Sequence, residues 1–102
     1  MSDPALGLIG LCARAGKLVS GEQACDQQVK RGAAKLVLVD QGASPLTRKA
    51  FQDACAYYKV PLRLVPEGAL GAAIGRPGRK AAAITDQALA NRISQLLTDT
   101  QH

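Results

Sequence analysis

The run Lys35-Leu36-Val37-Leu38-Val39 is the feature of this sequence that most constrains the fold. Leucine and the β-branched valine follow one another here without the polar alternation of a half-exposed strand. Because successive side chains of a strand point to opposite faces, both faces of this strand carry apolar groups that must be covered. The run therefore predicts a central strand that lies between two layers of helices.

Helical and extended segments alternate along the rest of the chain. Pro4 after Ser2 or Asp3 is typical of a helix start, and Ser44-Pro45 repeats that signal. The expected elements, in chain order, are a helix over residues 4–15, a strand over 18–20, a helix over 22–31, the strand over 35–39, a helix from 45 to the turn at 60–61, a strand over 62–65, a helix over 67–74, a strand over 80–85 and a last helix capped by Thr85 or Asp86. This alternation predicts the α/β class, as a three-layer α/β/α sandwich.

Size and charge limit the classes of protein to which this chain can belong. The chain has 102 residues, of which 47% are hydrophobic and 3% aromatic, so we expect a single domain over residues 1–102 with an aliphatic core. The net charge of +5 favours an anionic partner, although many soluble proteins share this balance. Residues 1–16 lack the basic start of a signal peptide, and glycines and Arg14 break their apolar run. We therefore expect a cytoplasmic protein without a membrane partner.

Three widely separated cysteines, Cys12, Cys25 and Cys55, lie among apolar residues. Their odd number and spacing predict reduced core side chains rather than disulfides or a metal site. The only histidine is His102, so a cysteine nucleophile would lack a histidine base. Because the sequence also lacks a paired acid and base and a glycine-rich phosphate loop, we expect no enzyme activity, no metal and no cofactor.

The residues that follow the first expected strand form a candidate ligand site. Leu18-Val19-Ser20 runs into Gly21, which can turn the backbone sharply and leave helix amides free for an anion. Helical spacing then places three polar side chains on one face, namely Gln23, Gln27 and Lys30. Amides and a cation on one ridge suit nucleic acid, and an ordinary solvated helix face is the alternative interpretation.

A wider pattern surrounds this junction. Its parts are the opening ARAGKLVSG at residues 13–21, a glycine that starts the second helix, Arg31-Gly32-x-Ala34 at the helix end, the strand over 35–39, Val60-Pro61 before another strand, and Leu70-Gly71-x-Ala73-x-Gly75. In this order the parts resemble the kink-turn-binding ribosomal-protein superfamily, which includes the archaeal seven-Ae and eukaryotic thirty-e proteins. The resemblance is closest to the bacterial YlxQ-like group and covers nearly the whole chain.

The resemblance implies a four-stranded mixed sheet and a non-catalytic protein that binds structured, kink-turn-like, ribosomal RNA. The family reads RNA with the motif G-x-N-E-x-x-K, whereas residues 21–27 here read Gly-Glu-Gln-Ala-Cys-Asp-Gln. The loop before Leu70-Gly71 is also one residue shorter than usual, which leaves Glu67-Gly68 at a polar family position. These departures favour an alternative, a ribosome-associated or assembly protein-interaction module that has lost kink-turn specificity.

The carboxyl ends of parallel strands meet at one edge of a sheet, so we expect residues 20–23, 40–43 and 65–70 to form the binding edge. The expected RNA-binding residues are Lys17, Gly21, Glu22, Gln23, Gln27, Lys30, Arg31, Asp40, Gln41, Pro66, Glu67, Leu70 and Gly71. For Gly71, the alternative to a close approach of RNA is close packing of helix against sheet. We expect a monomer whose partner is RNA, with the ribosome as a further candidate.

Two other groups allow more than one interpretation. Arg76, Arg79 and Lys80 form a basic turn that either extends the RNA contact or is only solvated. Tyr57 and Tyr58 suggest base stacking, as in proteins that bind single-stranded RNA. Their place at a helix end favours instead one ring that packs and one that reaches solvent.

Overall fold

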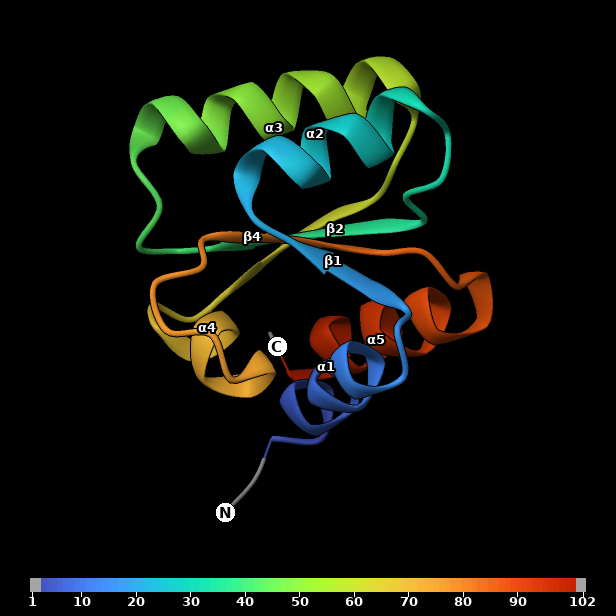
Figure 1. The fold of residues 1–102 in the computed structure, drawn as a ribbon, viewed down its shortest axis with the longest axis vertical. Helices are drawn as coiled ribbons and strands as arrows, with labels where there is room; N and C mark the ends of the chain where they lie inside the picture. Colours follow the sequence, from blue (N-terminus) through green and yellow to red (C-terminus); the bar gives the residue numbers. More distant parts are fainter. Residues whose placement is uncertain (1–2, 101–102) are drawn as a thin grey trace.

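A computed structural model describes residues 3–100, with side chains through residue 97 (Figure 1). The elements are α1 (Pro4–Arg14), β1 (Leu18–Ser20), α2 (Glu22–Lys30), β2 (Leu36–Asp40), α3 (Pro45–Tyr58), β3 (Leu62–Val65), α4 (Ala69–Ile74), β4 (Ala81–Ile84) and α5 (Gln87–Thr100). Helices α2 and α3 cover one face of the sheet, and α1, α4 and α5 cover the other (Figure 1). The predicted three-layer α/β/α sandwich is confirmed.

The sheet has the strand order β1-β4-β2-β3. Strand β4 is antiparallel to both of its neighbours, whereas β2 and β3 are parallel. The predicted four-stranded mixed sheet is therefore confirmed. Since two antiparallel steps restore the original direction, β1, β2 and β3 all run the same way and β4 alone runs against them.

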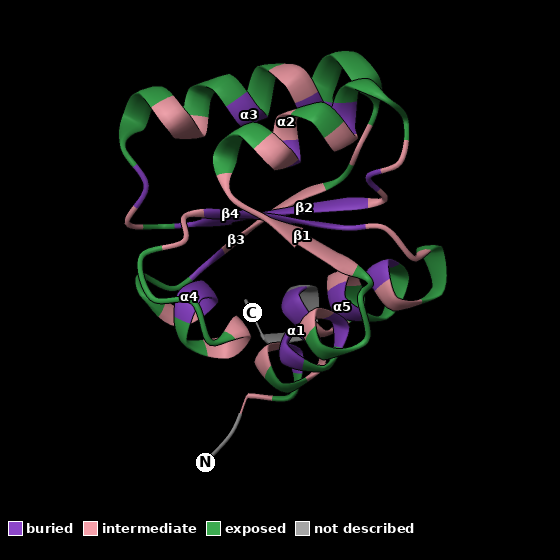
Figure 2. Cartoon of the chain, viewed as in Figure 1, coloured by how far each residue is buried: buried purple, intermediate pink, exposed green. Residues whose placement is uncertain are grey.

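Strand β2 carries the two-sided burial that its sequence predicts. Leu36 and Leu38 join the hydrophobic core beneath α1, α4 and α5, while Val37 and Val39 join the core beneath α2 and α3. Strand β4 is likewise buried along its whole length, as Figure 2 shows for the centre of the sheet. Burial of aliphatic surface contributes about 25 cal/mol per Å², and these two strands contribute residues to both hydrophobic cores.

The three cysteines are free and buried, as the sequence predicts. Burial raises the pKa of Cys25 to about 12 and that of Cys55 to about 11, and it also raises the pKa of Cys12. The Cys25 thiol donates to the carbonyl oxygen of Val19 at 3.4 Å. Since the thiolate is the reactive form, these protonated side chains act as core residues rather than nucleophiles.

Local hydrogen bonds fix the helix starts. The carboxylate of Asp3 accepts from the Ala5 amide at 2.8 Å, and the Ser44 hydroxyl accepts from the Thr47 amide at 3.1 Å. Asp86 rather than Thr85 caps α5, because its carboxylate accepts from the Leu89 amide at 2.9 Å. Among the described residues, no helix is long and apolar enough to cross a membrane.

Helix α4 begins at Ala69, two residues after the expected start at residue 67. Gly68 has a left-handed conformation with φ 80°, and the Ala69 amide donates to the carbonyl oxygen of Pro66 at 2.9 Å. This turn occupies the residues that the sequence assigned to the first helical turn.

Candidate nucleic-acid interface

The shared direction of β1, β2 and β3 brings their carboxyl ends to one edge of the sheet, together with the start of β4. Backbone hydrogen bonds tie these ends together: the Gly21 amide donates to the Ala81 carbonyl at 2.9 Å, and the Asp40 amide donates to the Lys80 carbonyl at 2.9 Å. We call this end of the molecule the loop edge; it comprises residues 20–23, 40–43, 65–70 and 76–80. The sequence predicts that the first three segments meet. The structure adds the fourth segment, residues 76–80, which the sequence did not place there.

Gly21 starts α2 with a backbone that suits only glycine. Its φ is 101°, and a Cβ atom at this position would lie 2.7 Å from the Nη1 atom of Arg79. No side chain caps the helix, so the amides of its first turn have no side-chain acceptor. The guanidinium of Arg79 therefore lies beside the positive end of α2, where both groups favour an anion.

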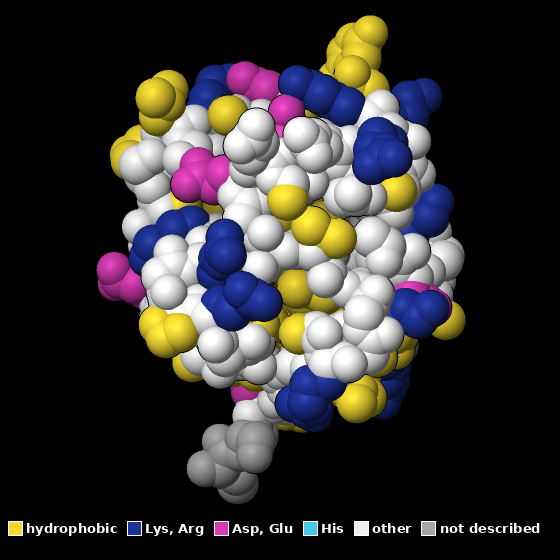
Figure 3. All heavy atoms as spheres, viewed as in Figure 1, with side chains coloured by type: hydrophobic (Ala, Val, Ile, Leu, Met, Phe, Trp, Pro, Cys, Tyr) yellow, Lys and Arg dark blue, Asp and Glu magenta, His cyan; other side chains and the backbone are white. Residues whose placement is uncertain are grey.

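Three cations occupy the turn before β4, namely Arg76, Arg79 and Lys80. The Arg79 amide donates to the carbonyl of Arg76 at 3.2 Å, which closes the turn around Pro77 and Gly78. Figure 3 shows Lys and Arg side chains gathered on the left of the view, where Figure 1 draws the α4–β4 connection. In the described part of the chain the ion pairs are Lys30–Asp26 and Lys49–Asp53, and neither includes a cation of this turn.

A polar hollow of about 310 Å³ opens beside the turn. Arg76 and Arg79 line it together with Ser20 at the end of β1. The sequence showed this basic turn but did not place it at the binding edge. The missing information was the direction of β4, because only an antiparallel β4 begins where β1 to β3 end.

Asp40 supports the loop edge from within. Its side chain is fully buried. One carboxylate oxygen accepts from the Gly42 amide at 2.7 Å and the other from the Gly68 amide at 2.9 Å. The carboxylate has no accessible surface and joins the loop after β2 to the loop after β3, which favours a supporting role over the predicted direct contact with RNA.

Leu70 and Gly71, which the sequence predicts to contact RNA, are also buried, and this burial favours a supporting role for both. A Cβ atom at Gly71 would lie 2.8 Å from the carbonyl oxygen of Arg76 and 3.1 Å from the Gly78 amide nitrogen. The Arg76 amide in turn donates to the Gly71 carbonyl at 2.9 Å. Close packing against the basic turn therefore explains the glycine, and α4 acts as the support of that turn.

Two glutamates at the loop edge have neighbours within the protein. The Thr47 hydroxyl donates to the Glu22 carboxylate at 2.9 Å, which draws that side chain toward α3. Glu67 lies over Gly42, where an added Cβ atom would lie 2.7 Å from its Cγ atom. The exposed polar residues that remain available at this edge are Gln23 and Gln41, with Gln27 one turn further along α2; Pro66 is exposed but apolar.

The structure does not bring Lys17, Lys30 and Arg31 to the loop edge. Lys17 precedes β1 at its other end, where its carbonyl accepts from the Thr85 amide at 3.0 Å. Helix α2 runs back over the sheet for nine residues, so its end lies about 13 Å from its start. Lys30 also forms an ion pair with Asp26 at 2.8 Å. Their predicted contacts with RNA therefore lie outside the loop edge.

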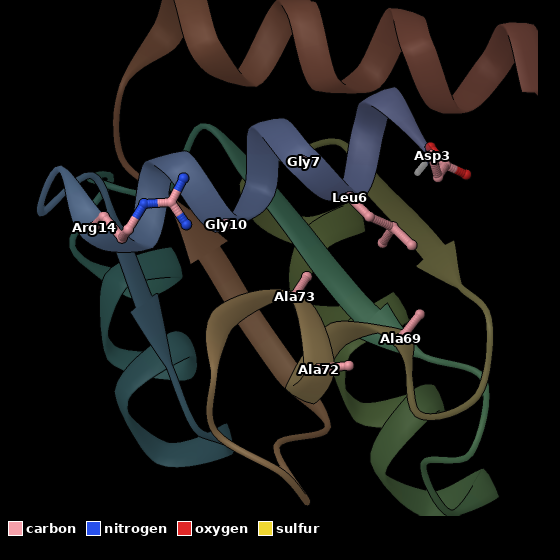
Figure 4. A pocket seen from close by; sticks show the side chains of 8 residues that line it. All are labelled: Asp3, Leu6, Gly7, Gly10, Arg14, Ala69, Ala72 and Ala73. Atoms are coloured by element: carbon pink, nitrogen blue, oxygen red, sulfur yellow. The ribbon is translucent and has the colours of Figure 1, made fainter. Parts of the chain in front are cut away.

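A hollow of about 480 Å³ lies away from the loop edge, between α1 and α4 (Figure 4). Its lining is mainly small and apolar: Leu6, Gly7, Gly10, Ala69, Ala72 and Ala73, with Asp3 and Arg14. The helices approach closely, because a Cβ atom at Gly10 would lie 2.7 Å from the Ala73 carbonyl oxygen.

Among the described residues, no group of three His, Cys, Asp or Glu side chains could hold a metal ion.

Comparison with known proteins gives one family. The model of the ribosomal protein L7Ae/L30e/S12e/Gadd45 family matches residues 5–94. The RNA-binding protein YlxQ of Bacillus subtilis (strain 168) is 45% identical over 91 residues, which cover 88% of this chain and 91% of that protein. The RNA-binding protein YlxQ of Enterococcus faecium is 38% identical over 94 residues, covering 91% and 90% of the two chains.

Solved structures give the same result at the level of the fold. A Bacillus halodurans protein of unknown function superimposes with a TM-score of 0.92 at 31% identity, covering 95% of this chain and 99% of that one. The 15.5kD RNA binding protein of Giardia lamblia has a TM-score of 0.77 at 26% identity, covering 94% and 83%.

Proposed function

Because the chain belongs to the ribosomal protein L7Ae/L30e/S12e/Gadd45 family, in its YlxQ-like group, we propose that it is a non-catalytic RNA-binding protein. The loop edge receives a structured, sharply bent RNA of the kink-turn type, and ribosomal RNA is the candidate target. The protein acts as a cytoplasmic monomer. The names of the YlxQ relatives and of the Giardia protein support RNA as the ligand.

The observation that carries the proposal is the meeting of the basic turn with the uncapped start of α2. Arg79 lies against Gly21, so one phosphate can accept from the guanidinium and from first-turn amides together. Arg76 and Lys80 extend the positive charge to a second phosphate. A sharp bend brings two phosphodiester strands close to each other, and a compact group of cations reduces their repulsion.

Base recognition falls to exposed polar side chains beside these cations. Gln23 on α2 and Gln41 after β2 each carry an amide, which can donate to and accept from a base edge. Asp40 and Gly71 take no part in contact but hold the loops at the correct distance from each other. Phosphate contacts thus position the RNA, and two glutamines supply the sequence-dependent part.

A second candidate function is a ribosome-associated or assembly module that binds protein and has lost kink-turn specificity. The substitutions in the helix-two motif favour it: Gln23 and Gln27 are exposed, and Ala24 is half-buried, where the family motif has Asn, Lys and Glu. The two functions differ in their response to salt, because RNA binding releases counterions and weakens steeply as salt rises.

The test is a titration of a kink-turn RNA and a straight duplex at several salt concentrations. The variant Arg76→Gln/Arg79→Gln removes two charges from the loop edge, and Lys49→Gln/Arg92→Gln removes two exposed charges elsewhere. We expect the first variant alone to weaken kink-turn binding and to flatten the plot of log affinity against log salt by nearly 2 units, at about 0.9 per phosphate contact. Equal affinity and slope in both variants would contradict the proposal.

A further inference from the structure

The edge of the sheet opposite the loop edge carries two exposed tyrosines. Tyr57 is 79% exposed and Tyr58 is 42% exposed, so both rings reach solvent and Tyr58 is the more covered of the two. The two rings meet edge to face with centroids 4.9 Å apart and an interplanar angle of 75°. They are two of the three aromatic side chains of the chain, and the free face of Tyr57 is available for stacking.

Two lysines lie beside Tyr58. Lys35, Tyr58 and Lys59 line one hollow of about 250 Å³, together with Gly32 next to Arg31. We call Arg31, Lys35, Tyr57, Tyr58 and Lys59 the far-edge patch. Figure 3 shows Lys and Arg side chains along the right of the view and an apolar side chain that projects at the top right, where Figure 1 draws the end of α3.

The backbone holds this patch rigidly. Lys59 ends α3 in a left-handed conformation with φ 59°, and the next amide, that of Val60, donates to the Cys55 carbonyl at 2.9 Å. The Val37 amide donates to the Pro61 carbonyl at 2.9 Å, which fixes the turn to β2. A ligand would therefore meet an ordered backbone, and the entropy that binding costs would come mainly from the side chains.

The charges of the patch are available to an anionic partner. In the part of the chain that the structure describes, no carboxylate forms an ion pair with Arg31, Lys35 or Lys59. The Lys35 ammonium donates to the Gly32 carbonyl at 3.3 Å. The nearby Asp26 is paired with Lys30. Cations interleaved with exposed aromatic rings match the chemistry of a single-stranded nucleic acid, which offers phosphates and unstacked bases together.

We propose that the far-edge patch is a second RNA-binding surface that takes an unpaired strand, with a base stacked on Tyr57 and the adjoining phosphates on Lys35, Lys59 and Arg31. The inference rests on the proposed function only in the nature of the ligand, because the patch shares no residue with the loop edge. The protein then holds a bent RNA at one edge and an unpaired segment, from the same RNA or another, at the opposite edge.

The probe is a labelled oligouridine of about ten nucleotides, the length that one or two small RNA-binding sites cover, followed by fluorescence anisotropy. Tyr57→Ser should weaken binding about 5- to 150-fold, the range expected for removal of one stacking ring. Tyr57→Phe should restore the affinity, because it keeps the ring. Leu46→Ser is the matched control, since Leu46 is 82% exposed at the other end of the same helix and has no place in the patch.

The charge variant is Lys35→Gln/Lys59→Asn, in which asparagine suits the left-handed backbone. We expect it to flatten the salt plot for oligouridine by about 1.4 units, at about 0.7 per phosphate of a single strand. In the unmodified protein, an unpaired extension should raise the affinity of a kink-turn RNA. In this variant the extension should no longer raise the affinity, and the RNA without extension should bind as it does to the unmodified protein.

Several results would overturn the inference. Oligouridine binding that fails in Arg76→Gln/Arg79→Gln and survives in Tyr57→Ser would place the strand at the loop edge. No oligouridine binding by a protein that binds kink-turn RNA normally would remove the second surface and leave the proposed function intact. A change of oligomeric state, seen by sedimentation in Tyr57→Ser with unchanged RNA affinity, would assign the patch to a second copy of the chain.

Discussion

The two edges of the sheet carry similar charge but offer an anion different chemistry. At the loop edge the start of α2 presents backbone amides and the positive end of its dipole, with Arg79 beside it. At the far edge α2 and α3 end, at Arg31 and Lys59, so the backbone presents carbonyl groups and the negative ends of two dipoles. Only side chains can bind phosphate there. Net charge alone therefore does not locate an RNA site.

The supports of the two edges differ as well. The loop edge depends on one buried carboxylate, Asp40, and on the close fit of Gly71 under the basic turn. The far edge depends on backbone hydrogen bonds at the end of α3 and at the start of β2. Substitutions that remove the contacts of Asp40 or Gly71 should therefore weaken the binding of structured RNA and leave the binding of an unpaired strand unchanged.

The largest effect is expected for Asp40→Ala, which leaves the Gly42 and Gly68 amides without their acceptor. We expect the free energy of unfolding to fall by about 3 kcal/mol, since a hydrogen bond to a charged group contributes about 1.5 to 3 kcal/mol. Urea denaturation measures this loss. The folded protein should bind kink-turn RNA poorly and oligouridine normally; equal losses for both RNAs would mean that the two edges are not independent.

Gly71→Val should have the next largest effect. The new side chain would overlap the carbonyl oxygen of Arg76, so we expect a loss of about 2 kcal/mol from overpacking. Ala72→Val is the control, because Ala72 is exposed in the same helix. Melting temperature and RNA titration on the same samples decide between the two roles of Gly71. Unchanged stability with lost RNA affinity would show that Gly71 meets RNA rather than the turn.

Restoring the family motif should raise the selectivity of the loop edge for kink-turn RNA and leave the far edge unchanged. The variant Gln23→Asn/Ala24→Glu/Gln27→Lys should raise the preference for a kink-turn over a straight duplex at least tenfold, about 1.4 kcal/mol, because a recovered base contact contributes about 1 to 3 kcal/mol. A competition gel shift at one salt concentration measures the preference. An unchanged preference would remove the α2 face from base recognition and favour the protein-binding alternative.

The smallest effect on structured RNA is expected for Lys30→Ala/Arg31→Ala. Sequence proximity to Gly21 suggests a strong effect, but both residues lie at the far end of α2 and Lys30 is paired with Asp26. We expect kink-turn affinity and its salt slope to stay within error of the unmodified protein. A clear loss of kink-turn affinity would mean that the RNA extends along the whole of α2.

The sequence predicts the sandwich because the run over residues 35–39 permits only a strand covered on both faces. It also predicts which three segments meet at the loop edge, since the direction of β1, β2 and β3 follows from the helical crossovers. It does not predict the contribution of Arg76 and Arg79, because nothing local to the turn reveals that β4 runs antiparallel.

The sequence also does not predict which polar side chains point into the protein. Asp40 is the last residue of β2 at the loop edge, where a carboxylate ordinarily reaches solvent, but its two oxygens accept from amides of two different loops. Lys17 and Arg31 lie near Gly21 in the sequence, yet a strand and a helix each carry the chain away from that glycine. Residues that are close in the sequence can therefore lie at opposite ends of a helix or strand, and closeness in the sequence does not by itself place them in one site.

The most direct measurement is a pair of amide chemical-shift titrations of the same isotope-labelled protein, one with a kink-turn RNA and one with oligouridine. The account predicts that kink-turn RNA shifts the amides of residues 20–23, 40–43 and 76–80, and that oligouridine shifts those of residues 31–35 and 57–60. Kink-turn shifts that cluster at the far edge, or in the groove between α1 and α4, would contradict the assignment of structured RNA to the loop edge.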